Sequence, residues 1–225
     1  MQRADRAGGP RRYRPRMAMV WLPLDDAAID SMLIVARSSW APADLDATWA
    51  AAGWTQPAGE SVAHLVFTDM NYTLSTGERL VRLGMRFDPD AITSLCVDFA
   101  TYYPETDLAD PEVADLVSPS RFGRWSADAT ATRADFDARY AEALDRLAAR
   151  LGAPVATGRH SEEWSHAVWR QADVLLVLAQ GENFDTYGEM DDACLWAVRH
   201  PADAPVPFGE NVYALLCGTY ADSPK

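Results

Sequence analysis

The sequence predicts an α+β domain in which a mostly antiparallel sheet of about six strands carries helices on one face. Segments in which apolar and polar residues alternate follow one another without a helical crossover, in the middle and again in the last third of the chain. One long amphipathic segment, with a period of roughly 3.6 residues, separates these two groups. The expected order is therefore two helices, three strands, a long helix and three or four strands.

The first predicted helix starts at Asp25 or Asp26, because either side chain can accept hydrogen bonds from the free N–H groups of a first turn. Its apolar residues share one face at helical spacing: Ile29, Leu33 and Ala36. A second short helix is expected over residues 42–53, where proline suits the first turn and glycine suits the end.

Three strands are then predicted, over residues 61–68, 79–87 and 92–102, and they are expected to form an antiparallel meander. The second of them alternates most clearly. Its apolar residues, such as Val81, are expected to face the core, which leaves Arg82 on the opposite face. A long acidic loop is expected over residues 103–125, because the segment is rich in proline and acidic residues.

The strongest helix is predicted over residues 132–151. Thr132 and Asp135 resemble a capping box, and Gly152 with Pro154 suits the end. The helix carries an apolar stripe: Phe136, Tyr140, Leu144, Leu147 and Leu151.

The last third is predicted to return to strands. Residues 164–170 and 173–180 suggest a hairpin, and residues 174–178 are continuously apolar, as in a central strand covered on both faces. Residues 193–199 are expected to form a further strand. Residues 208–217 fit either a final strand or a short helix.

A single domain is expected over residues 17–225, preceded by a basic arm over residues 1–16. Acidic residues outnumber basic residues by 33 to 20, which gives a formal net charge of -13. Six arginines and one acid lie in the arm, and subtracting its net +5 leaves -18 for the rest. The arm is expected to be disordered, or to be an upstream extension of a gene that starts at Met17 or Met19. A body this acidic repels nucleic acid and anionic membranes and favours basic partners.

The cysteines point to a cytoplasmic location. Cys96, Cys194 and Cys217 sit in apolar runs, where cysteine acts as a small buried hydrophobe. An odd count without paired spacing argues against a disulfide framework, so a reducing compartment is expected. No segment is apolar enough to cross a bilayer, which takes about 20 residues.

The histidines give no clear catalytic or metal motif. His160 and His166 are six residues apart in an extended segment, so both are expected on one side of a strand. Zinc sites need three or four convergent ligands, and no third ligand is visible nearby. His64 is expected to be half-buried in a strand. The sequence therefore predicts no catalytic residue, no metal and no cofactor.

The acidic loop over residues 181–192 is the predicted partner-binding surface, with the acidic segment 103–125 as the alternative. Interfaces favour aromatic residues at the centre and complementary charge around them, and this loop has two aromatic residues among five acids. The candidate residues are Glu182, Phe184, Asp185, Tyr187, Glu189, Asp191 and Asp192.

Three local motifs resemble small actinobacterial proteins of unknown function, many of which resemble toxin-immunity proteins or secretion chaperones, including the wider type III-chaperone-like α/β group. The motifs are the start of the second helix at Trp40-Ala-Pro-Ala-Asp44-Leu45, its end at Gly53-Trp54, and the apolar run 174–178. The resemblance covers about residues 20–200 and implies no catalytic residue. The basic arm and the acidic segment 103–125 are not part of the pattern.

The leading hypothesis is a non-enzymatic acidic binding protein, monomeric or homodimeric: an immunity protein for a basic toxin or a chaperone for a basic secreted client. One alternative is a small hydrolase-like enzyme that uses His64 or the His160–His166 segment; a pocket with histidine and carboxylates, one with a shifted pKa, would favour it. Another is a structural homo-oligomer, which an exposed apolar edge would favour. A broad acidic face without a pocket would favour the binding protein.

Overall fold

The computed structural model describes residues 16–57, 59–84, 92–106, 124–160, 164–183 and 190–217. The strands are β1 (Arg16–Trp21), β2 (Thr73–Ser75), β3 (Leu80–Gly84), β4 (Ser94–Thr106), β5 (Ser126–Asp128), β6 (Ala156–His160), β7 (Trp164–Gln171), β8 (Val174–Glu182) and β9 (Asp191–Arg199). The helices are α1 (Asp26–Arg37), α2 (Leu45–Ala51), α3 (Val62–Phe67), α5 (Arg133–Leu151) and α6 (Glu210–Leu216), with a 3₁₀ turn at η1 (Pro42–Asp44).

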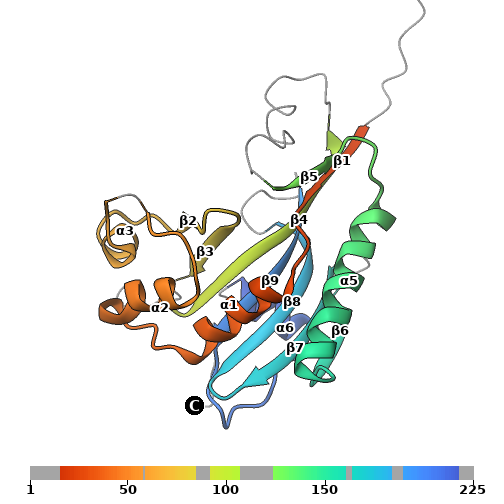
Figure 1. Cartoon of the computed structure of the whole chain (residues 1–225). Helices are drawn as coiled ribbons and strands as arrows, with labels where there is room; N and C mark the ends of the chain where they lie inside the picture. The colour runs from red at the N-terminus through yellow and green to blue at the C-terminus, as the bar shows by residue number, and fades with distance from the viewer. Residues whose placement is uncertain are drawn as a thin grey trace, which may run out of the picture.

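The strands form one antiparallel sheet, which confirms the predicted α+β class (Figure 1). Within the described residues the sheet has nine strands, more than the predicted number. The main path runs β2-β3-β4-β9-β8-β7-β6, and β1 pairs with β4 and β5 beside it. The predicted hairpin is confirmed as β7 and β8, and the predicted strand that follows it is confirmed as β9.

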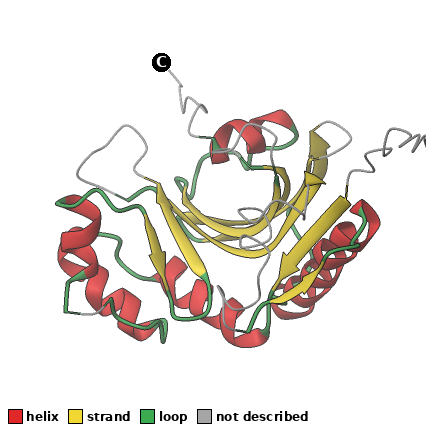
Figure 2. Ribbon diagram, turned by 90° about the horizontal axis from the view of Figure 1, so that it is seen from above, coloured by secondary structure: helices red, strands yellow, loops and turns green. Residues whose placement is uncertain are grey.

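The sheet is curved, and its convex face carries four of the five described helices (Figure 2). Helices α1, α2, α3 and α5 pack there around the main hydrophobic core. Alternate residues of the central strands form the sheet side of this core: Val97, Leu176 and Leu195 are at most 2 % exposed. The first eight residues of β8 are buried, as predicted for a central strand covered on both faces.

The concave face carries α6, which packs on a second hydrophobic cluster (Figure 2). Val212 and Leu215 of the helix lie in one cluster with Val177 of β8 and Val198 of β9. The segment 208–217, for which the sequence left two possibilities open, therefore contains a short helix. Its apolar side covers only part of the concave face, so polar residues of neighbouring strands can reach a cavity beside it.

Helix α5 confirms the strongest helix prediction. The Thr132 hydroxyl accepts a hydrogen bond from the Asp135 N–H at 3.3 Å, and an Asp135 oxygen accepts one from the Thr132 N–H at 2.7 Å. The capping box is therefore complete. Phe136 and Leu147 are fully buried, and the other stripe residues are partly buried against the core. Gly152 ends the helix with a φ of 83°, a left-handed conformation that favours glycine.

The predicted strand over residues 61–68 is wrong, because this segment is helix α3. The Ser61 hydroxyl accepts a hydrogen bond from the His64 N–H at 3.1 Å and so caps the first turn. Val62, Leu65 and Val66 then share one buried face at helical spacing. A meander exists, but its first strand is β2, which lies between the first two predicted strands.

Other predictions lie partly outside the described residues, namely the arm over residues 1–15, the end of the second predicted strand at residues 85–87 and most of the acidic loop, at residues 107–123. Arg16 is the first residue of β1, so the sheet begins at the end of the predicted arm. Among the helices that the structure describes, none combines the length and the hydropathy needed to span a membrane.

Candidate functional site

The predicted partner-binding loop lies only partly within the described residues. Glu182 ends β8 with an exposed side chain, as expected for a loop border. Four other candidates, Phe184, Asp185, Tyr187 and Glu189, lie outside the described ranges.

Asp191 and Asp192 are expected in a solvated loop, but they start β9 and are only 8 % and 7 % exposed. Adjacent residues of a strand point to opposite faces, so these carboxylates have different neighbours. Asp191 accepts a hydrogen bond from Arg133 of α5 at 2.8 Å, on the convex side. Asp192 faces Arg82 on the concave side. Each carboxylate can be buried because an arginine offsets its charge.

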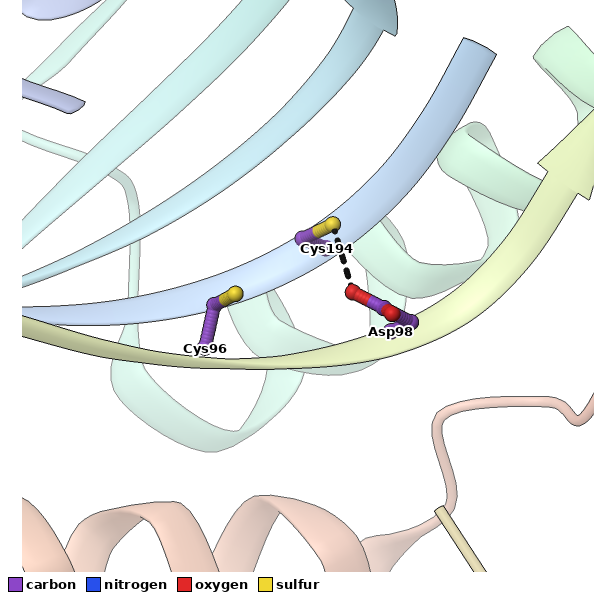
Figure 3. Close-up of side chains that lie close together, drawn as sticks. All are labelled: Cys96, Asp98 and Cys194. Atoms are coloured by element: carbon purple, nitrogen blue, oxygen red, sulfur yellow. Dashed lines mark hydrogen bonds between the residues drawn. The ribbon is translucent and has the colours of Figure 1, made fainter. Parts of the chain in front are cut away.

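Asp192 belongs to a polar cluster on the concave face, formed with Arg82, Cys96, Asp98 and Cys194. Arg82 of β3 pairs in register with Cys96 of β4, and Asp98 of β4 pairs with Cys194 of β9. Residues two apart on a strand share a face, so three neighbouring strands bring all five side chains together. Figure 3 shows Asp98 and Cys194 directed toward each other, with Cys96 on the same side of the sheet.

Arg82 lies at the centre of this concave polar cluster. Its Nη2 atom is 2.7 Å from Oδ1 of Asp98, 3.2 Å from Oδ2 of Asp192 and 3.0 Å from Sγ of Cys194. The Cys194 thiol in turn donates to Oδ1 of Asp98 at 3.1 Å. One guanidinium therefore reaches across β4 and faces a carboxylate on each of two strands.

A bulge in β4 adds Thr101 to the cluster. Asp98 pairs with Cys194, but the next partner in register, Ala193, pairs with Ala100, so Phe99 is an extra residue. The extra residue reverses the facing of the residues that follow it. Thr101 consequently points to the concave side, where its hydroxyl donates to Oδ1 of Asp192 at 2.8 Å. Asn183 donates its side-chain N–H to the other oxygen of Asp192.

Burial and charge shift the pKa values within the cluster. Burial raises the pKa of Asp192 to about 6, and Asp98 adds to this rise, whereas Arg82 opposes it. Burial also raises the pKa of Cys194 well above its ordinary value, so this group is a neutral thiol. Burial acts against the charge of Arg82, but the surrounding acidic groups outweigh it and hold the pKa of Arg82 high. Arg82 therefore keeps its positive charge, whereas Cys194 carries none.

The cluster contains three groups that could act as metal ligands. The ligand atoms of Cys96, Asp98 and Cys194 lie within 4.8 Å of one another. Thiolate and carboxylate donors suit zinc. However, Arg82 donates hydrogen bonds to Asp98 and Cys194, so its guanidinium occupies the position that a metal ion would take among these ligand atoms. A metal ion would have to displace a guanidinium and remove the proton of a buried thiol, so the geometry favours an internal ion pair.

A cavity of about 370 Å³ opens beside Arg82. Strands β3, β4 and β9, the end of β8, and helix α6 surround it. Among the described residues, its polar lining includes Glu182, Asn183 and Ser94, and its aromatic lining is Trp196 and Tyr213. A smaller adjoining pocket shares Arg82, Glu182, Asn183 and Trp196 with it and reaches Asp192, Cys194 and Trp164. The volume is within the range of about 300 to 1,000 Å³ that is usual for ligand sites.

His160 and His166 share one face, but on two strands rather than one. His160 of β6 pairs in register with Trp164 of β7, and Gly158 pairs with His166. The His166 ring lies over Gly158, where a Cβ atom would come within 2.9 Å of it. His166 is 1 % exposed, its ring nitrogens have no hydrogen-bond partner in the described structure, and burial and then His160 lower its pKa. It is a neutral, buried residue rather than a member of the cavity lining.

His64 is not in a half-buried strand as expected. It lies on α3 with 54 % of its side chain exposed, and its Nε2 is 3.7 Å from Oδ1 of Asp69. Helix α3 is on the convex side, whereas the cavity opens on the concave side. The structure therefore does not bring together the two histidine groups considered for catalysis.

The sequence prediction of the site missed Arg82, Asp98 and Trp196. For Arg82 and Asp98, the alternation of polar and apolar residues along each strand could have indicated the site. Arg82 alternates with Val81 and Leu83, and Asp98 follows Val97. These polar residues stand opposite the main core, which marks the other face as a polar surface. The order of the strands is what combines them into one site.

The chain matches no protein-family model, no curated protein and no solved structure.

Proposed function

We propose that this protein is a non-enzymatic acidic binding protein whose concave sheet face binds a basic protein, either a toxin that it neutralises or a secreted client that it protects. The observation that supports this most is the excess of carboxylates around the cavity. Arg82 faces Asp98 and Asp192 inside the cluster, and Glu182 adds a third carboxylate at the cavity. A negative concave site of this kind attracts and orients a basic partner.

The hydrolase alternative has one observation in its favour, because a carboxyl group with a pKa of about 6 resembles a catalytic acid or base. Yet both oxygens of Asp192 already accept hydrogen bonds, from Thr101 and Asn183. Cys194 is a neutral thiol that donates to Asp98, so it is poorly suited to act as a nucleophile. Both oxygens of Asp192 and the Cys194 thiol therefore already form hydrogen bonds within the site, which favours binding over catalysis.

A labelled oligoarginine peptide tests the proposal, with an oligoglutamate peptide as the negative control. Fluorescence anisotropy at low and at physiological salt should show binding of oligoarginine alone, and its affinity should fall as salt shortens the screening length to about 8 Å. Glu182→Gln should weaken binding about two- to fivefold, which is the contribution of one exposed ion pair. The protein should keep its melting temperature, because the exposed Glu182 side chain has no ion pair or hydrogen bond with the other described residues.

Glu60→Gln is the matched control, since Glu60 is an exposed glutamate just before α3, away from the cavity. It should bind oligoarginine like the wild type. Equal loss in both variants would mean that the overall charge of the body attracts the peptide, and it would overturn the assignment to the concave face. No binding of oligoarginine at low salt would overturn the proposal as a whole.

A further inference from the structure

We infer that the cavity beside Arg82 binds the guanidinium group of an arginine side chain from the basic partner, with Glu182 as its counter-ion and Trp196 as its stacking surface. This inference rests on the proposed function and adds the residue type that the partner inserts.

The lining of the cavity matches an amphipathic side chain. Glu182, Asn183 and Ser94 supply oxygen atoms, whereas Trp196, Tyr213 and Leu216 supply aromatic and aliphatic surface. An arginine side chain has the same division, with an apolar stem and a charged end that forms several hydrogen bonds. A purely apolar group would leave the carboxylate of Glu182 without a partner, and an anion would be repelled by it.

The charges at the cavity also favour a cation. Among the described residues of the lining, Arg82 is the one basic residue, and Asp98 and Asp192 hold its Nη2 atom at 2.7 Å and 3.2 Å. These two carboxylates more than offset the charge of Arg82. The Glu182 side chain is exposed and has no hydrogen bond or ion pair with another described residue, so a ligand can approach its carboxylate. A second guanidinium beside Arg82 would therefore enter a site that keeps a net negative charge.

Two features favour guanidinium over ammonium. Its planar fork can donate two parallel hydrogen bonds to the carboxylate of Glu182. Its flat face can also lie on an aromatic ring, and Trp196 already has the Cζ atom of Arg82 at 6.0 Å from its ring centroid. The same indole is thus within reach of one guanidinium and lines the space that would hold another.

The test compares two capped amino acids that differ in charge: acetyl-arginine methylamide and its neutral citrulline counterpart. Binding is followed by the NMR signal of the Trp196 indole N–H, assigned through Trp196→Phe. The arginine derivative should shift this signal saturably, and the citrulline derivative should bind at least about tenfold more weakly, a difference of about 1.4 kcal/mol. Glu182→Gln should reduce the affinity of the arginine derivative severalfold, and Glu60→Gln should not.

Equal binding of the two derivatives, or a shift that Glu182→Gln leaves unchanged, would overturn the inference. Failure of this inference can be distinguished from failure of the proposed function. If oligoarginine binds in a manner that depends on Glu182 while the arginine derivative leaves Trp196 unchanged, the concave face binds basic protein without inserting an arginine. If neither probe binds, both the inference and the proposed function fail.

Discussion

The two faces of the sheet are built from the same strands but differ in the side chains that point from them, which are apolar on the convex face and in part polar on the concave face. On the convex face, Val97, Leu176 and Leu195 enter one apolar core beneath α1 and α5. On the concave face, one residue away along the chain, Asp98 of β4 and Cys194 of β9 enter a hydrogen-bonded cluster. An apolar core tolerates exchanges that conserve volume, whereas every buried polar group depends on a particular neighbour. The convex face therefore depends on filled volume, and the concave face depends on the arrangement of specific chemical groups.

The largest effect is expected from removing the centre of the concave cluster. Arg82→Ala leaves Asp98 and Asp192 buried side by side without a counter-charge, which should cost about 3 to 5 kcal/mol of unfolding free energy. Chemical denaturation at neutral pH measures this. The loss should be smaller at about pH 5, where Asp192 is protonated and the repulsion is relieved.

Arg146→Ala is the control for this variant, because the Arg146 side chain is 52 % exposed and its Nη1 lies 3.9 Å from Asp26. It should change stability by less than about 0.5 kcal/mol. If Arg82→Ala also falls within that range, the concave cluster is not the interdependent unit described above.

Next in size is the removal of one apolar group from the convex face. Leu147→Ala should cost about 2 to 5 kcal/mol, because Leu147 is fully buried on the core-facing side of α5 and its truncation leaves a cavity. Leu144→Ala, one helical turn earlier and only partly buried, should cost less. The loss from Leu147→Ala should not depend on pH, in contrast to that from Arg82→Ala. An unchanged denaturation midpoint for Leu147→Ala would place the stripe of α5 in solvent.

The smallest net effect is expected from Asp192→Asn, and it should be visible as a dependence on pH. The pKa of Asp192 is about 6 in the folded protein, above its ordinary 3.8, so the folded state binds the proton more tightly. As pH rises from about 5 to about 8, ionisation of Asp192 therefore lowers the stability of the wild type. Asparagine cannot ionise, so the stability of the variant relative to the wild type should rise over this interval.

Urea denaturation of both proteins at the two pH values checks this prediction. Burial lowers the pKa of His166, which gives a pH effect of the opposite sign, but it is present in both proteins and cancels in the difference. A difference that stays flat from about pH 5 to about pH 8 would show that Asp192 titrates below this interval.

The fold was predictable where the pattern was long and its ends were marked. The helix over residues 132–151 has both a cap and a stripe, and it was confirmed. The segment 61–68 was too short for its apolar run to distinguish strand from helix. The decisive signal there was the Ser61 cap followed by Val62 and Leu65 at a spacing of three.

The candidate site was predictable only in part. Glu182 was predicted as a binding residue and lines the cavity, and the alternation in β3 already placed Arg82 opposite the core. Asp191 and Asp192 were assigned to a loop because they belong to a segment with five acids, residues 181–192, and nothing near them in the sequence indicates their arginines. Arg82 is 110 residues from Asp192, and only the adjacency of β3, β4 and β9 brings them together.

The bulge at Phe99 changes which residues of β4 face each side of the sheet. Before it, even-numbered residues such as Asp98 face the concave side; after it, odd-numbered residues such as Thr101 do. Tyr102 is thereby turned toward α5, where its ring stacks on Phe136 with centroids 5.6 Å apart. Deleting one residue here would exchange the two faces for the rest of the strand, placing a threonine in the apolar core and a tyrosine over Asp192. Substitutions in this segment would each affect one contact, whereas a single-residue deletion would affect the core and the cavity together.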